Sequence, residues 1–324
     1  MAGALSAVFE PGFFGSGPVH AALITGAVVA LVSGAVGVFT VLRSQSFAGH
    51  ALSDLGTLGG SGAFFLNVAP VFGFVGAGVA VAGAMDLFGA ERKRSRDVST
   101  GIVLGAVLGV SALLLYLDSL DSSTTGVTVT VLFGSVFNLA DYTVPAVAAC
   151  GGVGLLVLGL LYRPLLLSSV NPDLAAARGI PVRLLGLAFM TAMGVTVALA
   201  SLVVGTILSP ALLIGPAAAA LRLTRRPVAA MALAGGLGLA ATWIGVLLAY
   251  DSYYWPPKGD GWPVSFFVVA LVFAAYLLSG LGERRRGRRS AARGAEADCA
   301  ADPCAVDSLA ADPASAGRGL IEAV

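Results

Sequence analysis

Long stretches of the chain contain no charged residue. They cover residues 11–42, 55–85, 98–117, 122–140, 142–162, 184–221, 227–250 and 261–282. A helix that crosses a membrane needs about 20 predominantly apolar residues, so several of these stretches are too long for a single crossing. The pattern predicts an all-α, polytopic membrane protein.

Internal signals divide the longest stretches. Residues 67–70, Asn-Val-Ala-Pro, end one helix, so that another begins near Val71. A tight turn near Gly205 and Thr206 divides the stretch 184–221 into two crossings. The more polar residues 127–138 predict a re-entrant or interfacial segment, which is tolerated only where protein or water covers its backbone. Eight to nine spans are therefore expected, at 19–42, 48–66, 71–89, 98–117, 142–162, 184–203, 206–221, 228–250 and 263–281.

The composition agrees with a membrane protein. Of the 324 residues, 57% are hydrophobic and only 11% are charged, whereas about 25% of the residues of an ordinary soluble domain are charged. So few charges cannot cover the surface of a soluble protein of this size. Composition therefore excludes a soluble enzyme, a nucleic-acid-binding protein and a disordered scaffold, and makes the lipid bilayer the first partner of the chain.

The few basic residues predict the orientation, because Lys and Arg concentrate in cytoplasmic loops. If the loop 91–97 is cytoplasmic, 18 of the 19 basic residues face the cytoplasm, and Lys258 is the exception. Residues 1–18 are then an extracytoplasmic segment, residues 19–282 form the transmembrane domain, and residues 283–324 form a disordered cytoplasmic tail. Cys299 and Cys304 in this tail lack the further His or Cys residues that would complete a metal site.

Ionisable residues inside a membrane are costly and therefore mark candidate functional sites. His50 and Asp54 are spaced i, i+4 and Ser53 lies between them, so that on a helix the three are expected on one face. Imidazole and carboxylate together are suitable ligands for a divalent transition metal. The alternative is a His–Asp pair that only forms hydrogen bonds between helices or near the cytoplasmic interface.

Four segments occur in a characteristic order: residues 37–43 (GVFTVLR) with 46–54 (SFAGHALSD), 132–135 (LFGS), 171–175 (NPDLA) with Gly179, and 204–218 (VGTILSPALLIGPAA). Together they resemble the membrane permeases of ATP-binding cassette importers for zinc, manganese or iron, the ABC-3 family. The resemblance covers roughly residues 19–281. One departure is that His50 stands where the family has Asp, and Asp54 stands where it has His.

The resemblance implies a homodimeric permease in a bacterial plasma membrane, with the ion path between its subunits. His50, Asp54 and Ser53 would hold the transported ion transiently. Zn²⁺ is the first expectation for this ion and Mn²⁺ the second, and no cofactor would be bound permanently. An extracytoplasmic solute-binding protein would deliver the metal. An ATP-independent secondary transporter or channel is the alternative function, and a non-transporting membrane scaffold is a third.

The chain is not expected to hydrolyse ATP itself. Its only lysines, Lys93 and Lys258, stand in no G-x-x-x-x-G-K-[ST] nucleotide loop, so the energy would come from separate ATPase subunits.

The loop 163–183 is the expected docking point for those subunits. Asn171 can cap a short helix, Pro172 suits its first position, Asp173 suits its positive end and Gly179 can terminate it. By resemblance this helix, which includes Ala175, is the coupling helix. A plain solvated connector is the alternative.

Two further groups of residues are weaker candidates. Pro210 and Pro216 are expected to interrupt the 206–221 helix and to provide a hinge. Three carboxylates near the outer ends of the spans could attract cations, although solvated loops explain them better: Asp118, Asp121 and Asp141.

Overall fold

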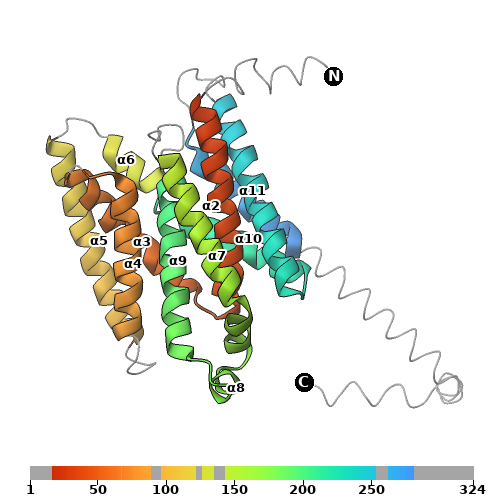
Figure 1. Ribbon diagram of the computed structural model, residues 1–324. Coiled ribbons are helices and arrows are strands. Elements are labelled where there is room, and N and C mark those ends of the chain that lie inside the picture. Colours follow the sequence, from red (N-terminus) through yellow and green to blue (C-terminus); the bar gives the residue numbers. More distant parts are fainter. Residues whose placement is uncertain are drawn as a thin grey trace, which may run out of the picture. The chain divides into compact units, whose positions relative to one another are not determined.

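The computed structural model describes residues 17–66, 68–88, 96–121, 126–134, 143–252 and 262–280, and every regular element among them is a helix (Figure 1). The predicted all-α fold class is confirmed. Residues 1–16 and 281–324 lie outside this part of the chain, and with them most of the predicted N-terminal segment and the whole predicted tail. The helices are α2 (Gly17–Leu42), α3 (Ser46–Phe65), α4 (Pro70–Phe88), α5 (Arg96–Asp121), α6 (Gly126–Phe133), α7 (Thr143–Val170), α8 (Pro172–Ala177), α9 (Val182–Val204), α10 (Ser209–Leu223), α11 (Pro227–Ser252) and the helix Val264–Gly280.

Each of the nine predicted spans has a helix at its place. Four of these helices, α2, α7, α9 and α11, are long and apolar enough to cross a membrane. The helix α3 has 20 residues, which at 1.5 Å per residue cover about 30 Å, the thickness of the hydrocarbon core. The apolar part of α4, the apolar part of α5, α10 and the helix Val264–Gly280 are shorter.

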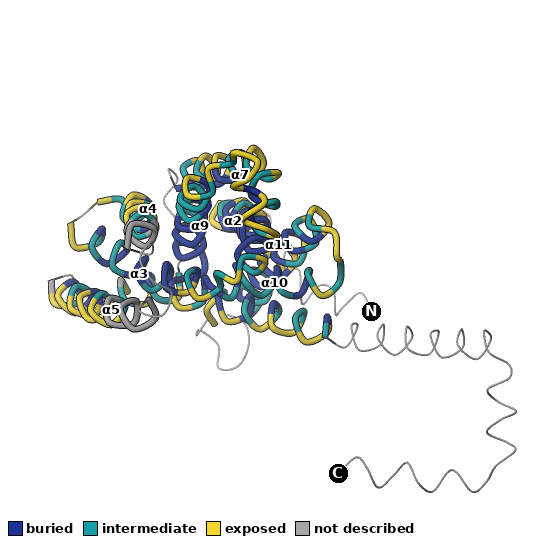
Figure 2. Tube along the Cα trace, turned by 90° about the horizontal axis from the view of Figure 1, so that it is seen from below, coloured by how far each residue is buried: buried dark blue, intermediate teal, exposed yellow. Residues whose placement is uncertain are grey.

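The most buried helices are α2 and α9, and α4, α5 and α7 expose much of their surface (Figure 2). Small residues bring α2 close to its neighbours. A Cβ atom added to Gly34 of α2 would lie 2.7 Å from the Cα atom of Gly235 in α11, closer than two carbon atoms can approach. In lipid, where helices associate through such packing rather than through the hydrophobic effect, this contact holds α2 against α11.

A second contact region joins α2 to α7 and α9. The ring of Phe39 meets the rings of Tyr162 and Phe189 edge to face, with centroids 5.8 and 6.4 Å apart. Edge-to-face pairs are favourable because the positive edge of one ring faces the negative face of the other. Leu52 of α3 and Leu213 of α10 belong to the same buried cluster, which therefore connects five helices.

The predicted turn near Gly205 is confirmed. Gly205 has φ 94° and ψ 157°, a backbone conformation that essentially only glycine adopts, and it separates α9 from α10. The amide of Thr206 donates to the carbonyl of Val131, 3.1 Å away, and the amide of Ile207 donates to that of Leu132, 3.4 Å away. The interrupted helix thereby satisfies its backbone groups against α6, as a membrane interior requires.

The helix α6 occupies part of the predicted re-entrant segment. Its eight residues rise about 12 Å, which is too short to cross a bilayer. Residues 135–142, which include the remainder of the segment and Asp141, lie outside the described part of the chain. The prediction of a short segment whose backbone is covered by protein agrees with the contacts between α6 and the α9–α10 turn.

Three local predictions are wrong. The helix α7 does not end at residue 162 but continues through Arg163 and Pro164 to Val170, so much of the predicted cytoplasmic loop is helical. Pro210 does not interrupt a helix, because α10 begins at Ser209 and a proline in the first turn removes no helical hydrogen bond. Asp118 is not in a solvated loop: α5 continues past it and its side chain is buried.

Candidate metal site

The helix α3 brings His50 and Asp54 together. The two residues are one turn apart, and Nε2 of His50 lies 3.6 Å from Oδ2 of Asp54. The side chain of His50 is 54% exposed and that of Asp54 is 23% exposed. Two potential metal ligands therefore point toward an open face of the molecule, where an ion can reach them.

Ser53 does not join this pair. Its side chain is fully buried, and its hydroxyl donates to the carbonyl of Thr206 and lies 2.5 Å from Oγ of Ser209. Because successive residues of a helix are about 100° apart, the side chains of Ser53 and Asp54 point in different directions and have different neighbours. Ser53 thereby connects α3 to the α9–α10 turn, and its role as a third ligand stays a prediction.

Ser201 and Ser209 complete a buried group of hydroxyls that the sequence did not reveal. The hydroxyl of Ser201 donates to that of Ser209 over 3.1 Å, and both side chains are fully buried. Ser209 is 156 residues from Ser53, so local spacing carries no signal for their contact. This hydroxyl cluster, formed by Ser53, Ser201 and Ser209, includes the residue that precedes Asp54 on α3.

One chain supplies only part of a metal coordination sphere. In the part of the chain that the structure describes, no group of three or more His, Cys, Asp or Glu side chains is placed to hold an ion. Transition metals in proteins take at least four ligands. His50 and Asp54 can therefore bind an ion tightly only if water or a second protein surface contributes the remaining donors.

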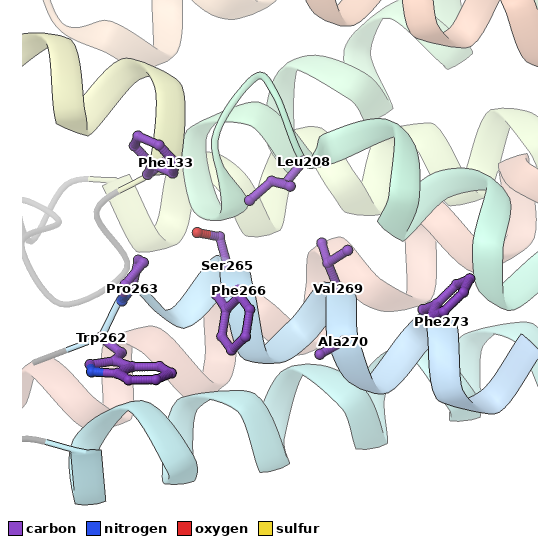
Figure 3. A pocket seen from close by; sticks show the side chains of 9 residues that line it. All are labelled: Phe133, Leu208, Trp262, Pro263, Ser265, Phe266, Val269, Ala270 and Phe273. Atoms are coloured by element: carbon purple, nitrogen blue, oxygen red, sulfur yellow. The ribbon is translucent and has the colours of Figure 1, made fainter. Parts of the chain in front are cut away.

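A pocket of about 500 Å³ lies elsewhere, between the helix Val264–Gly280, Phe133 of α6 and Leu208 of the α9–α10 turn (Figure 3). Trp262 and Ser265 contribute the only polar side-chain atoms among the residues that line it. A divalent metal requires several nitrogen, oxygen or sulfur donors, so this apolar pocket is not a metal site. The exposed pair on α3 remains the candidate.

The predicted short helix in the loop after α7 is present as α8. Oδ1 of Asn171 accepts a hydrogen bond from the amide of Leu174, 3.0 Å away, and Pro172 occupies the first turn together with Asp173. Gly179 follows with φ 77°, in the left-handed region that favours glycine. The capping residues thus hold a rigid, exposed corner between α7 and α9.

The sequence of the chain is similar to those of known metal-import permeases. The chain is 31% identical over 230 residues to the manganese import system permease protein ScaB of Streptococcus parasanguinis, covering 71% of this chain and 81% of that protein. It is 29% identical over 240 residues to the high-affinity zinc uptake system membrane protein ZnuB of Haemophilus influenzae, covering 68% of this chain and 87% of that protein.

A solved structure shows the same fold. The chain resembles a chain of PsaBC from Streptococcus pneumoniae, determined in complex with Fab, with a TM-score of 0.72 and 26% identity over 83% of this chain and 92% of the other. The family model for the ABC 3 transport family matches residues 18–278. The chain therefore belongs to the ABC 3 transport family, as the order of its sequence motifs predicted.

Proposed function

We propose that this protein is the permease subunit of an ATP-binding cassette importer that moves Mn²⁺ across the bacterial plasma membrane. The observation that carries the proposal is the pair His50 and Asp54, held 3.6 Å apart on an open face of α3 in an otherwise apolar bundle. An ionisable pair is retained in such surroundings, where it is costly, when it serves a function. A scaffold protein would not need it.

The metal proposed is manganese rather than zinc. The resemblance of the motifs favoured zinc, but most of the similar relatives are named for manganese import, at 28–31% identity, and the zinc permease ZnuB is 29% identical. One imidazole and one carboxylate form a donor set that either ion accepts, so the choice of manganese rests on the relatives. The ion is substrate and is bound only in passing.

We propose a homodimer with the ion path between the two copies. Among the residues that the structure describes, one chain brings two potential ligands together on α3, and His50 remains more than half exposed. Two copies that face each other through α3 would place four ligands around one ion. Mn²⁺ prefers octahedral coordination, so water would fill the remaining positions, and an ion without a complete protein cage can be released on the inner side.

ATPase subunits would bind at α8. An exposed, well-capped helix of six residues is a rigid contact element, and the positive-inside rule places it on the cytoplasmic side together with the C-terminus. A solute-binding protein would present the metal on the outer side. The chain itself would not be an enzyme.

The test is uptake of radioactive manganese in cells that depend on this importer. The double variant His50→Ala with Asp54→Ala should lose uptake, whereas His20→Ala, which removes an exposed histidine at the start of α2, should not. Uptake at the wild-type rate in the double variant would refute the metal site. Uptake that persists when the partner ATPase is inactivated would instead support a secondary transporter.

A further inference from the structure

Arg43 connects three helices at one end of the bundle. It follows the last residue of α2, and its Nη1 donates to the hydroxyl of Ser168 in α7 over 3.1 Å. The guanidinium carbon lies 5.3 Å from the ring centroid of Phe189 in α9, within the range of a cation–π contact. One half-buried side chain therefore touches α7 and α9 at the same time.

These two helices are the ones that flank α8. Ser168 stands three residues before Asn171, the cap of α8, and Phe189 lies in the second turn of α9, which begins directly after the α8 corner. Figure 1 shows the C-terminal end of α2 beside the end of α7 that leads into α8. A displacement of α8 that moves either flanking helix therefore reaches Arg43.

Arg43 is also joined stiffly to the helix that carries the candidate ligands. The connection to α3 is only Arg43, Ser44 and Gln45, with Ser44 in the left-handed region at φ 55°. The amide of Arg43 donates to the carbonyl of Phe39, and that of Gln45 donates to the carbonyl of Thr40, both over 2.9 Å. A fixed turn of three residues transmits displacement instead of absorbing it.

Arg43 is held by neutral partners, which its guanidinium group can leave for other partners when the helices move. Among the residues that the structure describes, no carboxylate lies within ion-pair distance of Arg43, so a hydroxyl and an aromatic ring hold the guanidinium. Partial burial lowers the pKa of Arg43, although arginine stays protonated in proteins. A buried salt bridge would fix one arrangement, whereas neutral partners permit a second one at modest cost.

We propose that Arg43 is the positioning residue that couples movement of α8 to α3, and thereby links ATP hydrolysis to movement of the ion at His50 and Asp54. The proposal rests on the proposed function, since it requires ATPase subunits at α8. It assigns to Arg43 a role other than that of an ordinary basic residue at the cytoplasmic end of a span.

The test uses the complete importer, reconstituted with its ATPase and binding protein in liposomes, and measures manganese uptake and ATP hydrolysis in the same sample. Arg43→Gln keeps a polar, hydrogen-bonding side chain but shortens it and removes its charge and its stacking on Phe189. Arg225→Gln is the matched control, because Arg225 is an exposed arginine between α10 and α11 and lies outside the loop 163–183. Ser168→Ala removes only the hydroxyl partner.

Arg43→Gln should lower the number of ions moved per ATP hydrolysed by at least about fivefold, the lower end of typical coupling between two sites. Ser168→Ala should lower it by a smaller factor, and Arg225→Gln should leave it unchanged. An unchanged ratio in Arg43→Gln, or an equal loss in Arg225→Gln, would overturn the proposal. If the wild-type importer itself shows no ATP-driven uptake, the proposed function fails independently of Arg43.

Discussion

Replacing Ser53 by alanine removes the one side chain of α3 that reaches the α9–α10 turn through two hydrogen bonds. The hydroxyl donates to the carbonyl of Thr206 and contacts Oγ of Ser209. The variant leaves His50 and Asp54 in place. We therefore expect it to weaken the attachment of α3 without removing His50 or Asp54.

The magnitude follows from the bonds that are lost. A hydrogen bond between membrane helices contributes about 0.6 kcal/mol on average and about 1.7 kcal/mol at most. Two such bonds give a loss of about 1 to 3 kcal/mol in the free energy of unfolding. Ser209→Ala removes the bond to Ser53 and the bond to Ser201, so its loss should be similar. The double variant should lose less than the sum, because both single variants break the same Ser53–Ser209 bond.

The assay is unfolding of the purified protein in mild detergent by titration with dodecyl sulfate. Ser61→Ala is the matched control on the same helix: Ser61 is equally buried, but its hydroxyl bonds only to carbonyls of α3, at 2.8 Å for Thr57 and 3.2 Å for Leu58. Those carbonyls keep their helical partners, so the control should change stability by less than about 0.5 kcal/mol.

Two results would refute this reasoning. If Ser53→Ala is as stable as Ser61→Ala, the hydroxyl cluster does not hold α3 against the turn. If the losses in Ser53→Ala and Ser209→Ala add fully in the double variant, the two hydroxyls do not share a bond.

Three further changes test the helix packing and the caps. Gly34→Ala should cost about 1 to 3 kcal/mol in the same unfolding assay, because its Cβ would meet the backbone of Gly235; Gly236→Ala, whose Cβ meets nothing within 4 Å, is the control. Gly205→Ala should cost about 1 to 3 kcal/mol, since φ 94° with ψ 157° excludes a side chain. Asn171→Ala should weaken α8 by about 1 kcal/mol, measured as faster amide exchange there, and Asn171→Asp should restore the protection.

An equal loss in Gly236→Ala would contradict the packing argument at Gly34. A Gly205→Ala protein with wild-type stability would show that the α9–α10 turn can adopt another conformation. Unchanged amide exchange in Asn171→Ala would mean that contacts with α7 and α9, rather than the cap, hold α8 in place.

Local rules predicted much of the helix arrangement. Charge-free stretches placed the spans, Gly205 marked the interruption before α10, and Asn171 with Pro172 marked the start of α8. The end of α7 was not predicted because Arg163 and Pro164 look like the end of a span. Arginine can extend its charge to the interface from within a helix, and a proline there is tolerated when neighbours satisfy the freed carbonyl.

The candidate site was predicted only in part, for a similar reason. The spacing of His50 and Asp54 follows from the pitch of one helix, so the sequence was sufficient to pair them. The same spacing suggested Ser53 as a third ligand. Spacing along one helix does not say which neighbouring helix a side chain will contact, because that depends on how the helices pack. Here α3 packs with Ser53 toward the α9–α10 turn, where the carbonyl of Thr206 accepts its hydrogen and the hydroxyl of Ser209 forms a second hydrogen bond with it.

The sequence by itself determined that the chain crosses a membrane many times, where it crosses and which two ionisable residues lie a turn apart on one helix. These properties depend on transfer free energies and helix pitch, which act within about 20 residues. Only the tertiary structure decided that Ser53 meets Ser209 and that Arg43 meets Ser168, 125 residues away. In an apolar bundle, a buried polar group must form its hydrogen bonds within the protein. Which groups lie close enough to bond depends on how all the helices pack together.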